Sequence, residues 1–320
     1  MTSQIPTQED YLKGYLNKMI RGDGSELDAY VSAVEKGKIV EDTHATARCY
    51  MINFNGQDFP RSKDLGKVLV EYLLDYSIPR HEIRKAQSKD FEMNTTKHIA
   101  ALHQKARTLF TTVSKTGEPG EVLLYLMTQS ILKLPQAIAK MSLKTSSQLH
   151  YNGADGVHLG YDSKNQKLNI YWGEAKLYQN HGEAIKNCFE SLAPFLAADG
   201  SNRVRDLDLL TSNLSTLEED LANALINYLD PDHPSYNSLE FKGVCLIGFD
   251  YTKYPKKQRL KKQQQILSEI LKDLDNWINK LKTAINSHLD LNKMVIEIFI
   301  IPFPSVSEFR SAFLEVLNSD

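Results

Sequence analysis

The chain has few cysteines, no long apolar run and no strong excess of either charge, and each absence narrows its function. Its three cysteines, Cys49, Cys188 and Cys245, are odd in number, far apart and not spaced as metal ligands. We therefore expect free thiols in a reducing cytoplasm and no disulfide framework. The most apolar run, residues 294–301, is interrupted by Glu297 and is far shorter than a membrane span, so no membrane association is predicted.

Three further features are missing. The N-terminus has no basic-then-apolar pattern of a secretion signal, which agrees with a cytoplasmic location. The sequence has no phosphate-binding loop of the form Gly-x-x-x-x-Gly-Lys-Ser/Thr, so any ATP-driven step must come from another chain. The formal net charge of −2 gives no indication of nucleic acid binding. A polyanion would have to be held by local basic patches.

What is present suits a globular α/β protein of 320 residues, with 42% hydrophobic and 24% charged residues. We predict a small N-terminal α/β region over residues 1–95, which could serve as a partner-binding module, and a main domain over residues 96–320. Residues 243–249 and 294–301 are continuous apolar runs, typical of strands covered on both faces. The helical pattern of residues 256–287 between them predicts a crossover helix, and hence a mixed central sheet flanked by helices.

Residues 150–177 carry the most informative pattern, a predicted β-hairpin around a polar turn at residues 163–166. Apolar residues alternate in both arms, and side chains two apart in a strand point the same way. Pairing Asp162 with Lys167 places every apolar residue of this face opposite another. A slip of one residue would move them to opposite faces, so the pattern fixes the register.

This register places Asp155 opposite Glu174, with Lys176 on the same face. Directly opposed residues have Cβ atoms roughly 4.5–5.5 Å apart. Two carboxylates at that separation repel unless they share a proton or a cation. A hard divalent cation bound by oxygen ligands is the simpler way to relieve this repulsion. The hairpin therefore predicts a cation site at the end of an apolar sheet face.

An Asp on one strand followed by Glu-x-Lys on the next resembles the core of the PD-(D/E)xK nucleases. The wider match is to the HamA family, the nuclease subunits of the Hachiman anti-phage defence system. It is carried by Phe110-Thr111-Thr112, Gly120-Glu121-Val122-Leu123-Leu124, Gly153-Ala154-Asp155-Gly156-Val157-His158 and Trp172-Gly173-Glu174-Ala175-Lys176-Leu177-Tyr178. The resemblance runs from about Ala100 to the C-terminus.

The resemblance implies a restriction-endonuclease-like fold and a nuclease that cleaves DNA with Mg²⁺, or with Mn²⁺. It implies that Asp155, Glu174 and the carbonyl of Ala175 bind the metal, and that Lys176 orients the attacking water. Glu121, in the predicted helix 121–133, would join the catalytic residues. An acid in the first turn also complements the helix dipole, so two explanations of Glu121 stay open. The family also implies control by a HamB-like helicase subunit.

Two alternatives bear on this hypothesis. The acid-x-Lys triplet alone is weak evidence, because it also occurs at Asp162-Ser163-Lys164 and Glu240-Phe241-Lys242. The hairpin could also be a structural remnant, in a subunit that binds DNA or a helicase without cutting. Six cations in residues 253–262, at the start of the predicted crossover helix, either contact phosphates or form a solvated helix face.

Overall fold

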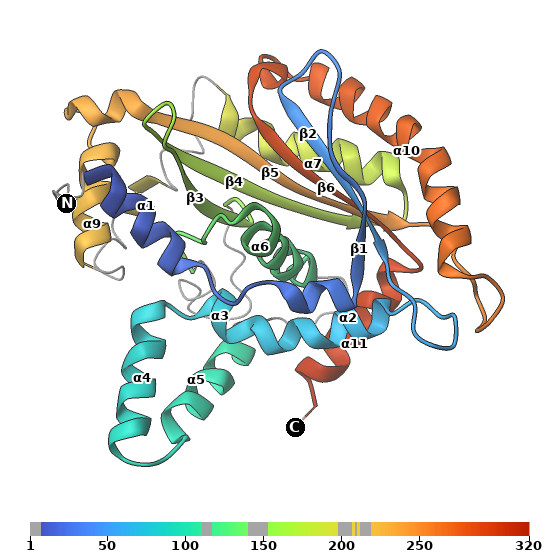
Figure 1. Cartoon of the computed structure of the whole chain (residues 1–320), viewed down its shortest axis with the longest axis horizontal. Helices are drawn as coiled ribbons and strands as arrows, with labels where there is room; N and C mark the ends of the chain where they lie inside the picture. The colour runs from blue at the N-terminus through green and yellow to red at the C-terminus, as the bar shows by residue number, and fades with distance from the viewer. Residues whose placement is uncertain are drawn as a thin grey trace, which may run out of the picture.

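A six-stranded mixed sheet forms the centre of the molecule (Figure 1). The computed structural model describes residues 8–110, 117–139, 153–197, 207–208, 210–211 and 219–319. The strand order is β1-β2-β6-β5-β4-β3. The strands are β1 (Val31–Ile39), β2 (Ala45–Ile52), β3 (Gly156–Asp162), β4 (Lys167–Tyr178), β5 (Leu239–Asp250) and β6 (Ile296–Phe303).

The four inner strands, β2, β6, β5 and β4, run parallel, and each edge strand is antiparallel to its neighbour. Strands β5 and β6 are adjacent and joined by the long helix α10 (Gln263–Asn286), which confirms the predicted crossover. Strands β5 and β6 are almost wholly buried along their apolar runs, as expected of strands covered on both faces. The predicted mixed sheet flanked by helices is confirmed.

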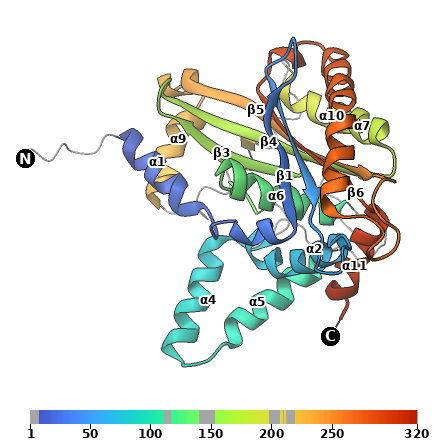
Figure 2. The same cartoon turned by 45° about the vertical axis from the view of Figure 1, so that its right-hand side comes forward.

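Helices cover both faces of this sheet. Helix α6 lies on one face, and α7 and α10 lie on the other (Figure 1). Trp172 of β4 stacks on Phe195 of α7 with ring centroids 5.6 Å apart, while Gly173 lies against Leu124 of α6. The main helices are α1 (Gln8–Met19), α2 (Ser62–Val68), α3 (Leu73–Ser77), α4 (Arg80–Glu92), α5 (Lys97–Thr108), α6 (Glu118–Leu132), α7 (His181–Leu196), α9 (Glu219–Leu229), α10 (Gln263–Asn286) and α11 (Val306–Leu317). Helices α4 and α5 project as a hairpin away from the sheet (Figure 2).

The β3–β4 hairpin has the register that the sequence predicts. Asp162 pairs with Lys167, and the apolar pairs follow outward to Val157 and Trp172. Asp162 accepts hydrogen bonds from the backbone of Lys164 and Asn165, which closes the polar turn. Helix α7 begins after Asn180, whose side chain accepts hydrogen bonds from two backbone N–H groups of the first turn.

Two expectations about local structure are wrong. The sequence pattern gives only helix and loop up to residue 45, yet residues Val31–Ile39 form strand β1. Its register shifts twice against β2, and most of its residues are partly or fully exposed, so no clean alternation marks it. The crossover helix begins at Gln263 and not near Lys256. A helix that began near Lys256 would place most of the six cations in its first turns, at the positive end of the helix dipole.

Strands β1 and β2, from the first part of the chain, belong to the same sheet as β3–β6. The division near residue 95 stays a prediction. Of the residues that carry the family resemblance, Thr111 and Thr112 lie outside the described ranges. Among the helices that the structure describes, none is long and apolar enough to cross a membrane.

Candidate metal centre

Asp155 immediately precedes β3, beyond the last pair of the hairpin ladder, Gly156 with Gly173, so the predicted strand pairing of Asp155 with Glu174 is not formed. Its backbone N–H donates to the Gly173 carbonyl at 2.8 Å, and its Oδ2 accepts from the Ala175 N–H at 2.8 Å. The carboxylate thus takes the place of a strand partner for Ala175. The N–H and C=O of one residue point to the same side of an antiparallel strand. The Ala175 carbonyl is therefore directed to the same edge as the Asp155 side chain.

The Glu174 side chain lies on the face of the sheet that α7 covers, and it is only 5% exposed. Burial, followed by the nearby Asp155 charge, raises the pKa of Glu174 to about 8. Lys176 and Ser191 act against this rise but do not cancel it. The raised pKa means that burial disfavours the ionised form of Glu174, and a cation beside the carboxylate would relieve this cost.

Lys176 completes the group, with its side chain 22% exposed and its ammonium paired with the Glu174 carboxylate. Burial alone would lower the pKa of Lys176, but the charges of Glu174 and Asp155 outweigh burial and raise it. Each of the three groups perturbs the pKa of another, so the structure brings Asp155, Glu174 and Lys176 together. The Cys188 thiol of α7 supports this part of β4 by donating to the Glu174 carbonyl at 3.7 Å.

Glu121 approaches from the other face of the sheet, in the first turn of α6. The Tyr76 hydroxyl lies 3.1 Å from Glu121 Oε2 and 3.4 Å from the Asp155 carbonyl oxygen. Burial, followed by the charges of Glu121 and Asp155, raises the pKa of Tyr76 far above its usual value. Tyr76 therefore remains a neutral hydrogen-bond donor beside both residues.

No sequence pattern marks Tyr76 as part of this centre, because its two contacts lie 45 and 79 residues away along the chain. Spacing within a helix reports only neighbours three or four residues apart. A tyrosine at the end of a buried helical face, Tyr76 in α3, is indistinguishable in sequence from a core residue.

This donor set fits a hard divalent cation. Two carboxylates, Asp155 and Glu174, influence one another, and the Ala175 carbonyl points to the edge where Asp155 lies. Within the described ranges, no group of three or more His, Cys, Asp or Glu side chains is placed to hold a metal ion. Mg²⁺ commonly takes one or two carboxylates and keeps several waters, so a site with few protein ligands suits it.

The other two acid-x-Lys triplets have different surroundings. Asp162-Ser163-Lys164 forms the exposed turn between β3 and β4. Glu240 lies in β5, and its carboxylate is paired with both Lys167 and Lys242. These pairings lower the pKa of Glu240. Neither triplet has a buried glutamate whose pKa is raised by a neighbouring aspartate, as Glu174 has.

The family model described as HamA matches residues 28–317, which is most of the chain. No curated protein matches the sequence.

Proposed function

The chain belongs to the HamA family and is a component of the Hachiman anti-phage defence system, and from this premise we propose that it is a Mg²⁺-dependent nuclease that hydrolyses DNA. The observation that carries the proposal is the contact of the Asp155 carboxylate with the Ala175 N–H, beside the buried Glu174. A hairpin with these residues, followed by a parallel strand, supports a PD-(D/E)xK core.

The roles follow from the position of each group. Asp155, Glu174 and the Ala175 carbonyl would hold Mg²⁺ or Mn²⁺. The cation supplies Lewis acidity toward the phosphate and makes a bound water more acidic. Lys176, kept protonated by the two acids, is placed to orient the attacking water and to stabilise negative charge that develops on the phosphate.

Glu121 has a supporting role in this proposal. Its carboxylate is held beside Asp155 by Tyr76, which donates to one of the two at a time. An acid in this position can accept a hydrogen bond from a water of the metal shell. Glu121 also lies in the first turn of α6, where its charge stabilises the helix.

Control of the nuclease would come from a helicase subunit, because the sequence contains no phosphate-binding loop for ATP. In this proposal a HamB-like helicase restrains the nuclease and releases it on sensing invading or damaged DNA. The support is the family membership of the chain.

The test is plasmid cleavage by the purified chain with Mg²⁺ and with EDTA. We expect cleavage by the wild type with Mg²⁺ only, and loss of cleavage in Glu174→Ala and Lys176→Ala. The matched controls are Glu240→Ala and Lys242→Ala, which alter the same triplet on the adjacent strand, and they should cleave like the wild type. Equal cleavage by all five proteins would refute the proposed site.

A second function is favoured by one observation, the ion pair between Glu174 and Lys176. An ion pair between these two residues could have a purely structural role. The chain would then be a subunit that binds DNA or the helicase without cutting. Titration with Mg²⁺ or Mn²⁺ in the presence of DNA separates the two functions. Heat of binding that depends on Asp155 supports the nuclease, and its absence supports the structural subunit.

A further inference from the structure

Several lysines of the described surface are paired with acids. Lysines 38, 105, 186, 272, 282 and 293 each lie within 4.0 Å of a carboxylate oxygen. The charges of these six lysines are therefore balanced locally.

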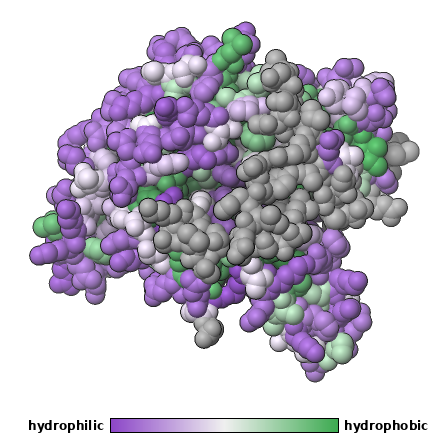
Figure 3. Space-filling view, turned by 180° about the vertical axis from the view of Figure 1, so that it is seen from behind, coloured by the Kyte–Doolittle hydropathy of each residue, from purple (hydrophilic) through white to green (hydrophobic). Residues whose placement is uncertain are grey.

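Residues 253–262, which we call the basic loop, depart from this pattern. The sequence KYPKKQRLKK contains six cations and no acid. Five of the six are exposed and the sixth, Lys261, is half-buried. Within the described part of the chain, none of the six forms an ion pair. The side of the molecule that carries α10 and this loop is mainly hydrophilic when seen from behind (Figure 3).

The basic loop is held in place by its uncharged residues. The Tyr254 ring is buried and stacks on Phe54 at 6.0 Å, and its hydroxyl accepts from the Ile52 N–H at 2.9 Å. The Arg259 N–H donates to the Gln57 carbonyl at 3.1 Å. The loop is therefore fixed against the segment that follows β2.

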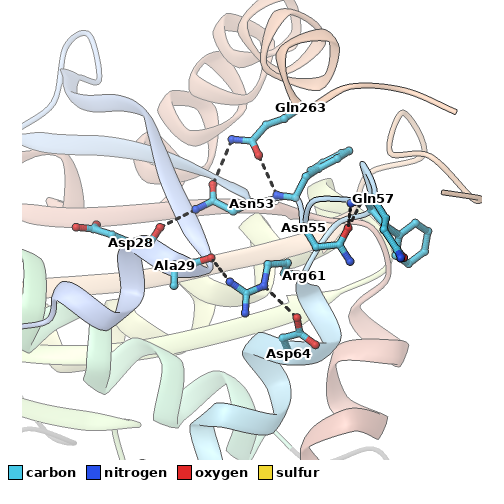
Figure 4. Close-up of polar contacts among 10 residues, drawn as sticks. Asp28, Ala29, Asn53, Asn55, Gln57, Arg61, Asp64 and Gln263 are labelled. Atoms are coloured by element: carbon cyan, nitrogen blue, oxygen red, sulfur yellow. Dashed lines mark hydrogen bonds and ion pairs between the residues drawn. The ribbon is translucent and has the colours of Figure 1, made fainter. Parts of the chain in front are cut away.

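A second anchor lies where the loop enters α10. Gln263 Oε1 accepts from the Phe54 N–H at 2.8 Å, and the same side chain points to Asn53 (Figure 4). Asn53 in turn donates to the Asp28 carbonyl at 2.8 Å. Both ends of the basic loop are thus joined to the sheet, and its cations are presented on a fixed backbone.

This arrangement does not stabilise the fold. Six like charges within ten residues repel one another, and they lie before the N-terminus of α10, where the helix dipole disfavours cations. The cations are held where an anion would relieve this repulsion. Lysine and arginine in such a run bind the regularly spaced charges of a phosphate backbone.

The position of the basic loop relates it to the candidate metal centre. Glu174 pairs with Cys245 of β5, and Asp250, the last residue of β5, lies five residues further along. At about 3.3 Å per residue, β5 ends about 16 Å along the strand from the level of Glu174, and the basic loop begins three residues later. One turn of duplex DNA is about 34 Å long, so one bound duplex can reach both places.

We propose that the basic loop binds backbone phosphates of the DNA duplex whose scissile phosphate lies at Asp155, Glu174 and Lys176. This inference rests on the proposed nuclease function and names the surface that holds its substrate. The contacts are made to phosphates, so they confer affinity without sequence preference.

The test is binding of a fluorescein-labelled 30-base-pair duplex, measured by anisotropy in EDTA over a series of KCl concentrations. The variant is Lys253→Gln/Lys256→Gln/Lys257→Gln, whose side chains are exposed. The control is Lys63→Gln/Lys67→Gln/Lys293→Gln, which removes the same charge from lysines that are paired with acids. Circular dichroism confirms that both variants are folded.

We expect the loop variant to bind roughly tenfold more weakly near 0.15 M salt. Its plot of log affinity against log salt should be shallower by about 0.9 per lost contact, or up to about 2.7. The control should match the wild-type slope. Equal slopes for the two variants would overturn the inference, as would loop-dependent binding to anionic phospholipid vesicles without binding to DNA.

The same measurement separates this inference from the proposed function. EDTA removes any cleavage, so binding is observed without chemistry. Loop-dependent DNA binding by a wild type that never cleaves with Mg²⁺ would contradict the nuclease alone. Cleavage that persists with no loop effect on binding would contradict the basic loop alone.

Discussion

Two identical kinds of triplet lie on adjacent strands of one sheet and have opposite surroundings. The site triplet, Glu174-Ala175-Lys176, is on β4, and the second triplet, Glu240-Phe241-Lys242, is on β5. The Glu174 side chain is 5% exposed and that of Glu240 is 36% exposed. Burial raises the pKa of the first glutamate, and pairing with lysines lowers the pKa of the second.

The difference arises from the place of each triplet along the sheet. The second triplet lies at the beginning of β5, opposite residues 169–171 of β4. The site triplet lies where β3 has already ended, so the Asp155 carboxylate can fill the free edge. A neighbouring acid and a missing strand partner therefore distinguish a candidate metal centre from a surface ion pair.

The largest expected difference is in the rate of DNA cleavage. Glu174→Gln removes a carboxylate ligand and should lower the rate of plasmid cleavage with Mg²⁺ by about a thousandfold, because metal stabilisation of the transition state contributes several kcal/mol. Glu240→Gln removes only a surface ion pair and should stay within about twofold of the wild type. Similar losses in both variants would remove the distinction between the triplets.

The pH dependence of metal use should follow the site triplet alone. A pKa of about 8 for Glu174 means that a proton competes with the metal below that pH. At subsaturating Mg²⁺, the cleavage rate should rise by up to about tenfold per pH unit between pH 6 and 8. The Glu240→Gln variant should keep this profile. A rate that is flat over this range would contradict the raised pKa.

Stability without metal should respond to the two glutamates with opposite sign. Glu174 has a higher pKa folded than unfolded, so the folded state binds more protons and loses stability as the pH rises from about 4.5 to 8. Glu174→Gln removes this loss and should raise the free energy of unfolding in EDTA by roughly 2 kcal/mol at pH 8, with little effect at pH 4.5.

Glu240 has a lowered pKa, so its contribution is present above its unfolded pKa and lost as the pH falls through the folded one. Because its side chain is partly exposed, Glu240→Gln should lower the free energy of unfolding by less than about 0.5 kcal/mol at pH 8. Urea denaturation at pH 4.5 and pH 8 measures both effects. A destabilised Glu174→Gln variant at pH 8 would contradict the assigned direction.

The smallest expected difference concerns the tyrosines beside each triplet. Tyr76→Phe removes the hydroxyl beside Glu121 and the Asp155 carbonyl, a hydrogen bond worth about 1 kcal/mol. The Mg²⁺ concentration for half-maximal cleavage should rise roughly fivefold, with little change at saturating Mg²⁺. Tyr171→Phe, beside Lys242, is the control and should leave this concentration unchanged. Equal shifts in both variants would indicate a general effect on folding.

The sequence predicts the hairpin register because local rules determine it. Strict alternation and a polar turn determine the pairs from Val157 with Trp172 to Asp162 with Lys167, but Asp155 lies beyond the ladder and is placed by its contact with the Ala175 N–H. The link from Glu121 through Tyr76 depends on packing between α3 and α6, which no local pattern reports. The basic loop is also missed by local patterns. The helical spacing of apolar residues predicts a helix from residue 256, but the helix begins only at Gln263.

The sequence does not predict strand β1, for a different reason. Strand β1 is an edge strand with exposed charges at Lys36 and Lys38 and a partly exposed one at Glu35, and bulges interrupt its pairing with β2. Such features protect an edge strand from pairing with other chains. The same features remove the alternation by which a strand is recognised in sequence.

Titration of the chain with Mn²⁺ at pH 8, by calorimetry and with a non-cleavable phosphorothioate duplex present, tests the metal centre most directly. One Mn²⁺ site is expected in the wild type and in Glu240→Gln, and no site in Asp155→Asn. Binding of Mn²⁺ to Asp155→Asn with the wild-type affinity would contradict the assignment of the two carboxylates to one cation.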